Sequence, residues 1–170
     1  QGYRDDHIVM IMEDDIANNS QNPELGVVRV RPDGENLYAD VEIDYRLSEL
    51  SPADVAAILA GERSERLPEV IAASEYDNIF VFWSGHGEYG EMLWGRNAAM
   101  KENDMRKMLE SLSAKGNFRK MLWMVETCYS GSVARVSEGI PGVMFITAAD
   151  ENETSKADVF SNKLNVWMSN

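Results

Sequence analysis

Short, uninterrupted apolar runs that end in polar residues or glycine constrain the fold more than any other feature of this sequence. The clearest of them occupy residues 7–12, 78–83, 120–125 and 143–147. Such a run is typical of a strand that is buried on both faces, as the strands of parallel sheets are. Parallel neighbours cannot be joined by a tight hairpin, so the runs predict crossover segments between them.

Helical patterns occupy the segments between these runs. Residues 51–54 supply an N-cap serine, a proline at the first helical position and an early acid, followed by apolar residues on one face. Residues 103–114 carry methionine and leucine at helical spacing, and shorter helices are expected at 64–73 and 164–168. The sequence therefore predicts an α/β fold with a mostly parallel central sheet and helices on both faces.

Residues 17–36 interrupt this alternation. They are rich in Asn, Pro, Gly and Asp, so we expect a long surface excursion in which only residues 27–30 form a brief strand or hairpin. Just before it, Asp14 and Asp15 are adjacent carboxylates without further ligands, a pattern more typical of a solvated loop than of a metal site. We predict neither a metal nor a cofactor.

Charge and cysteine content exclude several classes of function. The formal net charge is −13 at pH 7, so nucleic acid and anionic membrane surfaces would be repelled. No apolar run approaches the roughly 20 residues that a membrane-spanning helix needs, so we predict no membrane insertion. The single cysteine, Cys128, excludes an internal disulfide framework and a cysteine-based metal site, which leaves its own reactivity as the question.

Three polar segments follow predicted strands and should meet at one edge of the sheet. His86 and Cys128 follow the second and third apolar runs, and residues 150–156 follow the fourth. In open α/β sheets, ligands bind outside the carboxyl ends of the strands. This convergence predicts an active site that contains a histidine and a cysteine.

A cysteine and a histidine placed together can perform nucleophilic catalysis. A free thiol is only a few per cent ionised at neutral pH, and a neighbouring imidazole takes its proton during attack. His86 lies between two glycines, which allow close approach of backbone and substrate, whereas His7 opens a predicted strand. His86 precedes Cys128 by 42 positions, close to the roughly 50 of caspase-type enzymes. Backbone N–H groups of Gly87 and of the turn at Cys128 can hold an oxyanion.

Simpler interpretations of these residues stay open from residue type alone. A lone cysteine at a strand end is by default a small buried apolar residue, and His86 can be a turn residue that bonds the backbone. Glu126, two positions before the cysteine, can form a structural ion pair. The motifs around these residues decide between structure and catalysis.

Motifs around the histidine and the cysteine resemble those of a known family. Ser-Gly-His-Gly at 84–87 and Glu-Thr-Cys-Tyr-Ser-Gly-Ser at 126–132 look like the histidine and cysteine motifs of the legumain (asparaginyl endopeptidase) family of caspase-fold cysteine peptidases. Residues 9–19 and 147–155 are similar to family segments in the same order, and residues 40–46 are closer to the catalytic subunit of the glycosylphosphatidylinositol transamidase. The resemblance covers nearly the whole chain.

The resemblance implies a caspase-like fold in a single peptidase domain over residues 1–170, without the family's first strand and without a C-terminal prodomain. It implies a polypeptide substrate, and a second chain or a missing segment that supplies the first strand. It implies no cofactor. Secreted, periplasmic and lysosome-like locations are compatible with the family, and the compartment stays unknown.

Carried over to this sequence, the resemblance assigns Cys128 as nucleophile and His86 as general acid/base. The oxyanion hole falls to the backbone N–H groups of Gly87 and Cys128. The S1 pocket, which holds the side chain before the scissile bond, falls to three residues: Glu126, Thr154 and Ser155. The family has an acid deeper in this pocket, and its nearest match here is Val166, so a preference for asparagine is left open.

Three functions are compatible with these motifs. The first is an endopeptidase that hydrolyses peptide bonds through a thioester acyl-enzyme. The second is a transamidase or peptide ligase on the same site, in which an amine replaces water at deacylation. The third is a catalytically inactive caspase-fold interaction domain. We predict the first; a product that carries an added amine would indicate the second, and the sequence upstream of Gln1 would discriminate the third.

Overall fold

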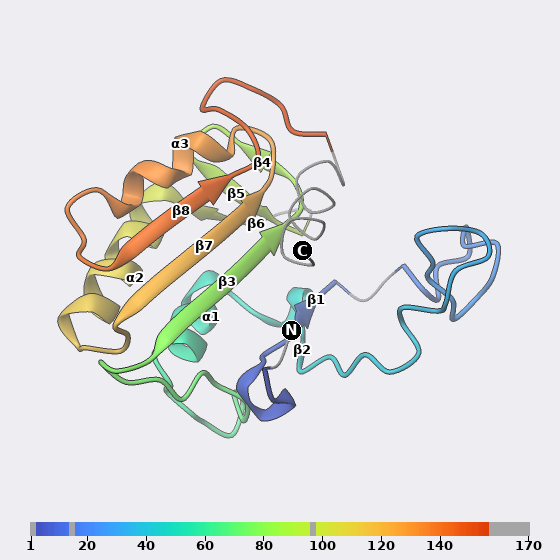
Figure 1. Cartoon of the computed structure of the whole chain (residues 1–170), viewed down its shortest axis with the longest axis horizontal. Coiled ribbons are helices and arrows are strands. Elements are labelled where there is room, and N and C mark those ends of the chain that lie inside the picture. Colours follow the sequence, from blue (N-terminus) through green and yellow to red (C-terminus); the bar gives the residue numbers. More distant parts are fainter. Residues whose placement is uncertain (1–2, 14–15, 96–97, 157–170) are drawn as a thin grey trace. The chain divides into compact units, whose positions relative to one another are not determined.

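The computed structural model describes most of the chain (Figure 1), namely residues 3–13, 16–95 and 98–156. Several sequence-based expectations lie outside these described residues: the carboxylates Asp14 and Asp15, the helix at 164–168 and the S1 position Val166. The described chain divides into two compact units, with the boundary between Ser51 and Pro52. The expectation of a single domain over the whole chain stays a prediction.

The central sheet belongs to the unit that begins at Pro52. Its strands are β3 (Asn78–Ser84), β7 (Lys120–Glu126) and β8 (Val143–Thr147), all parallel and in the order β3-β7-β8 (Figure 1). They coincide with three of the apolar runs. The predicted α/β fold with a mostly parallel sheet is confirmed.

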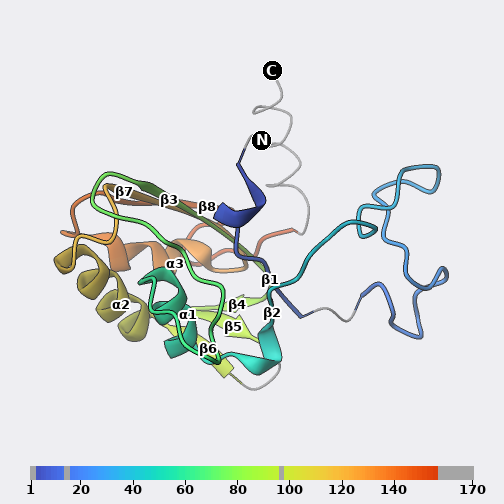
Figure 2. The same cartoon turned by 90° about the horizontal axis from the view of Figure 1, so that it is seen from below.

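Helices accompany this sheet: α1 (Pro52–Leu59), α2 (Glu102–Ala114) and α3 (Ser130–Ala134), the last followed by the 3-10 turn η3 (Arg135–Ser137). α1 begins at the proline that the sequence marks as a first helical position. Figure 2 shows all three α-helices on the same side of the sheet. Among the helices of the described residues, none is both long and apolar enough to cross a membrane.

The core lies between the helices and one face of the sheet. α2 contributes the apolar stripe expected from its sequence: Met105, Met108, Leu109 and Leu112. On the sheet, Trp123 is fully buried and stacks on Phe145 with ring centroids 5.6 Å apart. Full burial of a large apolar side chain contributes roughly 1.5–3 kcal/mol, so this layer fixes the strands that carry the site.

The opposite face of the same strands is apolar but open in the described structure. Four side chains on it, all from the two outer strands β3 and β8, are between 37% and 55% exposed: Phe80, Phe82, Met144 and Ile146. They alternate along each strand with residues of the covered face, as the two-residue period of a strand requires. None of the three described α-helices lies on this side (Figure 2).

Residues 64–73 contain no helix, so that prediction is wrong. Pro68 stands in the middle of the segment, where it lacks an N–H and disfavours helical geometry at the residue before it. The chain turns instead, and the Leu67 N–H donates to the hydroxyl of Ser64 at 3.0 Å. Leu67 is nevertheless buried, so its apolar side chain correctly indicated a core position even though the helix is absent.

A small antiparallel sheet follows β3 and was not expected from the sequence. It comprises β4 (Gly87–Glu88), β5 (Glu91–Trp94) and β6 (Ala98–Lys101), in that order. Gly90, at a φ of 73°, allows the turn between β4 and β5. Trp94 is buried, and its ring centroid lies 5.3 Å from that of Trp83 on β3. This hairpin begins at the residue after His86.

The unit that ends at Ser51 has little regular structure. Its elements are η1 (Asp5–His7), β1 (Ile11–Met12), β2 (Tyr45–Arg46) and η2 (Leu47–Glu49), and the two strands pair in parallel. β1 is the end of the first apolar run. Its pairing is extended by Asp44, whose carboxylate accepts from the Met10 N–H at 2.7 Å.

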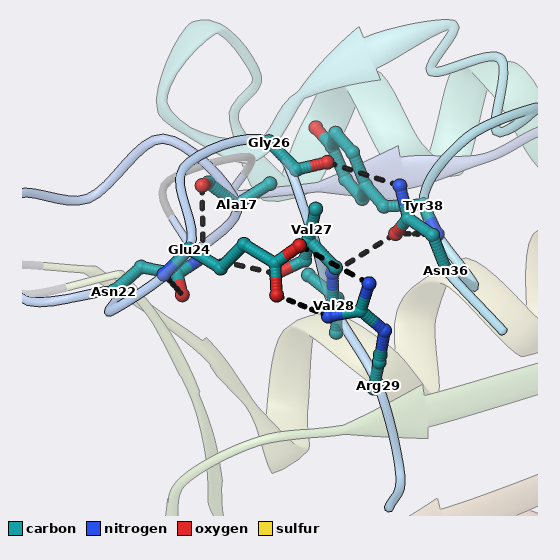
Figure 3. Close-up of polar contacts among 9 residues, drawn as sticks. All are labelled: Ala17, Asn22, Glu24, Gly26, Val27, Val28, Arg29, Asn36 and Tyr38. Carbon is teal, nitrogen blue, oxygen red and sulfur yellow. Dashed lines mark hydrogen bonds and ion pairs between the residues drawn. The ribbon is translucent and has the colours of Figure 1, made fainter. Parts of the chain in front are cut away.

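The long excursion is ordered by asparagine side chains in place of a strand ladder (Figure 3). The Asn22 amide donates to the carbonyls of Ala17 and Val27 at 2.9 and 3.0 Å. The Asn36 side-chain oxygen accepts from the Val28 N–H at 2.9 Å. These bonds occupy backbone groups that a hairpin would use, so the strand expected at 27–30 does not form.

Candidate active site

The loops that carry the histidine and the cysteine leave adjacent parallel strands at the same level. Ser84 and Glu126, the last residues of β3 and β7, are register partners. The Gly85 N–H continues the pairing by donating to the Glu126 carbonyl at 3.2 Å. His86 and Cys128 each lie two positions past a strand end, at the carboxyl edge where α/β sheets bind ligands.

Gly87 brings the histidine loop into contact with the cysteine loop. A Cβ at Gly87 would lie 2.5 Å from the carbonyl oxygen of Cys128 and 2.6 Å from the hydroxyl of Thr127. Real Cβ atoms do not approach backbone that closely, so only glycine fits. Thr127 is itself buried, and its hydroxyl donates to the Cys128 carbonyl at 3.1 Å. The two motifs therefore pack against each other through backbone.

The cysteine is held in a turn that presents its sulfur beside a third loop. Cys128 is a free, half-buried thiol whose Sγ lies 3.7 Å from the Ser155 carbonyl oxygen. Tyr129 follows it in the left-handed conformation, with a φ of 55°. For a tyrosine this backbone is strained, and such strain is characteristic of functional turns. The Tyr129 N–H donates to the Glu153 carbonyl at 2.7 Å.

Two buried serines after the cysteine tie its turn to the neighbouring loops. The Ser130 hydroxyl accepts from the Ala149 N–H at 3.0 Å. The Ser132 hydroxyl accepts from the Gly90 N–H at 2.8 Å and donates to the Tyr129 carbonyl at 2.6 Å. Ser132 therefore joins the hairpin after the histidine to the turn after the cysteine.

Replacing Ser132 with alanine is expected to lower the free energy of unfolding by about 1–3 kcal/mol, because the Gly90 N–H loses its acceptor. The histidine loop should also become less well placed, which lowers kcat/KM by roughly tenfold. Denaturant titration and peptide cleavage measure the two effects. Ser137→Ala is the matched control, since within the described residues the Ser137 hydroxyl bonds only the nearby Ala134 carbonyl, three positions before it. If kcat/KM fell equally in Ser132→Ala and Ser137→Ala, Ser132 would have no specific role in positioning the histidine loop.

The assigned side chains differ in exposure. His86 is exposed, and its imidazole has no hydrogen-bond or ion-pair partner in the part of the chain that the structure describes. Glu126 is buried at the end of β7. Thr154 is exposed and Ser155 half-buried, in the loop that contacts the cysteine. The Ser155 segment thus lies at the thiol, and His86 is open to solvent.

A cavity of about 610 Å³ lies beside the cysteine. It is lined by residues of both motif loops and by one of the third loop: Gly87, Glu88, Tyr89, Cys128, Tyr129 and Asn152. Sequence reasoning did not single out Glu88 or the two tyrosines, although Glu88 directly follows the histidine motif. Across the described ranges, no group of three or more His, Cys, Asp or Glu side chains is arranged to hold a metal ion.

Comparison with known proteins places the chain in a family. The model of the Peptidase C13 family matches residues 1–169. The chain belongs to the Peptidase C13 family. Legumain from Rattus norvegicus is 30% identical, over 98% of this chain and 39% of its own length. The vacuolar-processing enzyme beta-isozyme of Arabidopsis thaliana is 33% identical over 91% of this chain and 32% of its own, and legumain from Canavalia ensiformis is 32% identical over 91% and 33%.

Membership of the Peptidase C13 family confirms the recognition made from the histidine and cysteine motifs. The chain spans about two fifths of the length of the rat relative, or 39%. The match shows the family, and the roles of the individual residues stay predictions.

Proposed function

We propose that this chain is the catalytic part of a cysteine endopeptidase of the legumain type, with Cys128 as nucleophile and His86 as general acid/base. The observation that carries the proposal is the backbone contact of Gly87 with Cys128, which brings the two motif loops together at the carboxyl edge of the sheet. Family membership supports the same chemistry.

In the proposed reaction, His86 accepts the proton of the Cys128 thiol and the thiolate attacks the scissile carbonyl carbon. The oxyanion accepts hydrogen bonds from the N–H groups of Gly87 and Cys128, and each such donor is worth a few kcal/mol in the transition state. The tetrahedral intermediate collapses as the C–N bond breaks, and His86 returns the proton to the leaving amine. Water then attacks the thioester, transferring a proton to His86, and releases the acid and the thiol.

The proposed S1 pocket has the groups that an asparagine side chain needs. The Asn carboxamide offers two N–H donors and a carbonyl acceptor. The carboxylate of Glu126 can accept from the amide nitrogen, and the hydroxyls of Thr154 and Ser155 can donate to its oxygen. A carboxylate at the same position of the substrate would be repelled by Glu126, so the pocket favours asparagine over aspartate.

Active-site labelling tests the proposal. Acyloxymethyl-ketone probes with Asn, Asp or Arg at P1 are added to the purified chain, and adducts are detected by intact mass. We expect one adduct on Cys128, formed fastest with Asn, and slower labelling of His86→Gln. Alkylation by iodoacetamide in parallel shows that the thiol is accessible. A folded sample that iodoacetamide modifies but no probe labels would contradict the proposal.

A further inference from the structure

The cavity beside Cys128 is distinct from the proposed S1 pocket. Its walls come from Gly87, Glu88 and Tyr89 of the histidine hairpin and from the turn at the nucleophile. The proposed S1 residues are absent from its lining: Glu126, Thr154 and Ser155. A substrate whose carbonyl lies on the sulfur therefore has a second cavity next to the bond that is cut.

The chemistry of the proposed reaction indicates which half of the substrate enters this cavity. His86 must deliver a proton to the nitrogen of the leaving amine, so the leaving half has to lie on the side of the imidazole. Glu88 and Tyr89 are the second and third residues after His86; Glu88 ends strand β4, and Tyr89 begins the turn that leads to β5. The cavity is therefore placed to receive residues that follow the scissile bond.

The side chains that line the cavity suit a cation. Glu88 is exposed and has no ion pair or side-chain hydrogen bond within the described ranges. Tyr89 is 55% exposed and Tyr129 half-buried, so both residues border solvent. A carboxylate attracts ammonium or guanidinium directly, and tyrosine faces add a cation–π attraction of about 0.5–2 kcal/mol.

Arg135, a cation that contacts this lining, is paired with a carboxylate. Arg135 lies 3.4 Å from the Tyr89 hydroxyl through one guanidinium nitrogen, and another nitrogen of the same group forms an ion pair with Glu151. Glu88 is thus left as the uncompensated charge of the cavity wall among the described residues. The net charge of the chain, −13, adds a long-range attraction for basic substrates.

We propose that this cavity is a specificity pocket for the leaving side of the substrate, and that Glu88 with Tyr89 and Tyr129 selects lysine or arginine in the first two positions after the scissile bond. The inference rests on the proposed endopeptidase function. It specifies which substrate sequences the proposed peptidase prefers, namely those with a basic residue just after the scissile bond.

Matched peptides test the inference. Two peptides with the same Asn at P1 carry lysine or its uncharged analogue norleucine directly after the scissile bond, and a second pair carries them one position later. We expect kcat/KM to be about tenfold higher for lysine in at least one pair, which corresponds to 1.4 kcal/mol. The ratio should fall toward one in Glu88→Gln and with added salt.

Variants separate the pocket from general charge. Glu91→Gln is the matched control, since Glu91 lies on the same hairpin but pairs with Lys101 at 3.5 Å and does not line the cavity. It should retain the preference for lysine, whereas Glu88→Lys should favour glutamate at that position. The inference is overturned if the unmodified chain cleaves the lysine and norleucine peptides with equal kcat/KM. It is also overturned if Glu91→Gln loses the preference for lysine as fully as Glu88→Gln does.

Probe labelling distinguishes failure of this inference from failure of the proposed function. The acyloxymethyl-ketone probes carry no peptide on the leaving side, so their reaction with Cys128 does not depend on the cavity. Labelling without a preference for lysine overturns the specificity pocket and leaves the peptidase intact. Absence of labelling overturns both.

Discussion

Replacing Cys128 with alanine is expected to abolish peptide cleavage, with a fall in kcat/KM of about 10⁴ or more, because no other side chain at the site can form the thioester. The free energy of unfolding should change by less than about 1 kcal/mol, since among the described residues the half-buried thiol makes a single, long polar contact, with the Ser155 carbonyl. Cleavage assays and denaturant titration on the same samples measure the two quantities.

Cys128→Ser provides the chemical control. The hydroxyl keeps the shape and the hydrogen-bonding capacity of the side chain, but it is a much weaker nucleophile without a strong base beside it. Both variants should therefore lose cleavage to a similar extent while they stay folded. Retention of activity by Cys128→Ala would exclude Cys128 as the nucleophile, and loss of activity with loss of folding in both variants would show a structural role.

The parallel sheet was predictable because each of its strands is a continuous apolar run in the sequence. β3, β7 and β8 lie where those runs were found, and the loops that follow them carry the histidine and the cysteine. Because parallel strands end at a common edge, the loops that carry His86 and Cys128 could be predicted to adjoin, and they meet at Gly87. The runs overstated burial, since Phe80 and Phe82 remain nearly half exposed.

The elements that escaped prediction are those whose backbone bonds depend on distant residues. β4 and β5 are short, and their pairing at Gly90 is held by Ser132, 42 residues later in the chain. In the excursion of residues 17–36, backbone groups bond to the side-chain amides of Asn22 and Asn36. Secondary-structure propensities do not show which side chains will form such bonds.

The fine geometry of the site was equally hidden. The tyrosine after the nucleophile adopts a left-handed conformation that is uncommon for its type, so only the fold indicates it. The cavity next to the thiol arises where the β4–β5 hairpin meets that turn. Its walls combine residues more than 30 positions apart, Tyr89 and Tyr129 among them, and no local pattern joins them.

Replacing Gly87 with alanine is expected to lower kcat/KM by about 10²-fold or more. The new Cβ would stand 2.5 Å from the Cys128 carbonyl oxygen and 2.8 Å from the Thr127 Cβ, so one of the two loops must move. A displacement of about 1 Å at reacting groups can cost 10²-fold, and loss of one oxyanion donor costs a similar factor. The Gly87 N–H would move together with the imidazole before it.

Gly85→Ala is a control that differs only in its surroundings. Gly85 flanks the same histidine on the other side, and a Cβ there would meet no atom of the described structure within 4 Å beyond its chain neighbours. Its N–H would still donate to the Glu126 carbonyl, so kcat/KM should change by no more than about threefold. Cleavage and probe-labelling rates of the two variants, measured beside their unfolding midpoints, give the comparison. If Gly85→Ala were as damaging as Gly87→Ala, flexibility around the histidine would matter more than its close approach to the nucleophile.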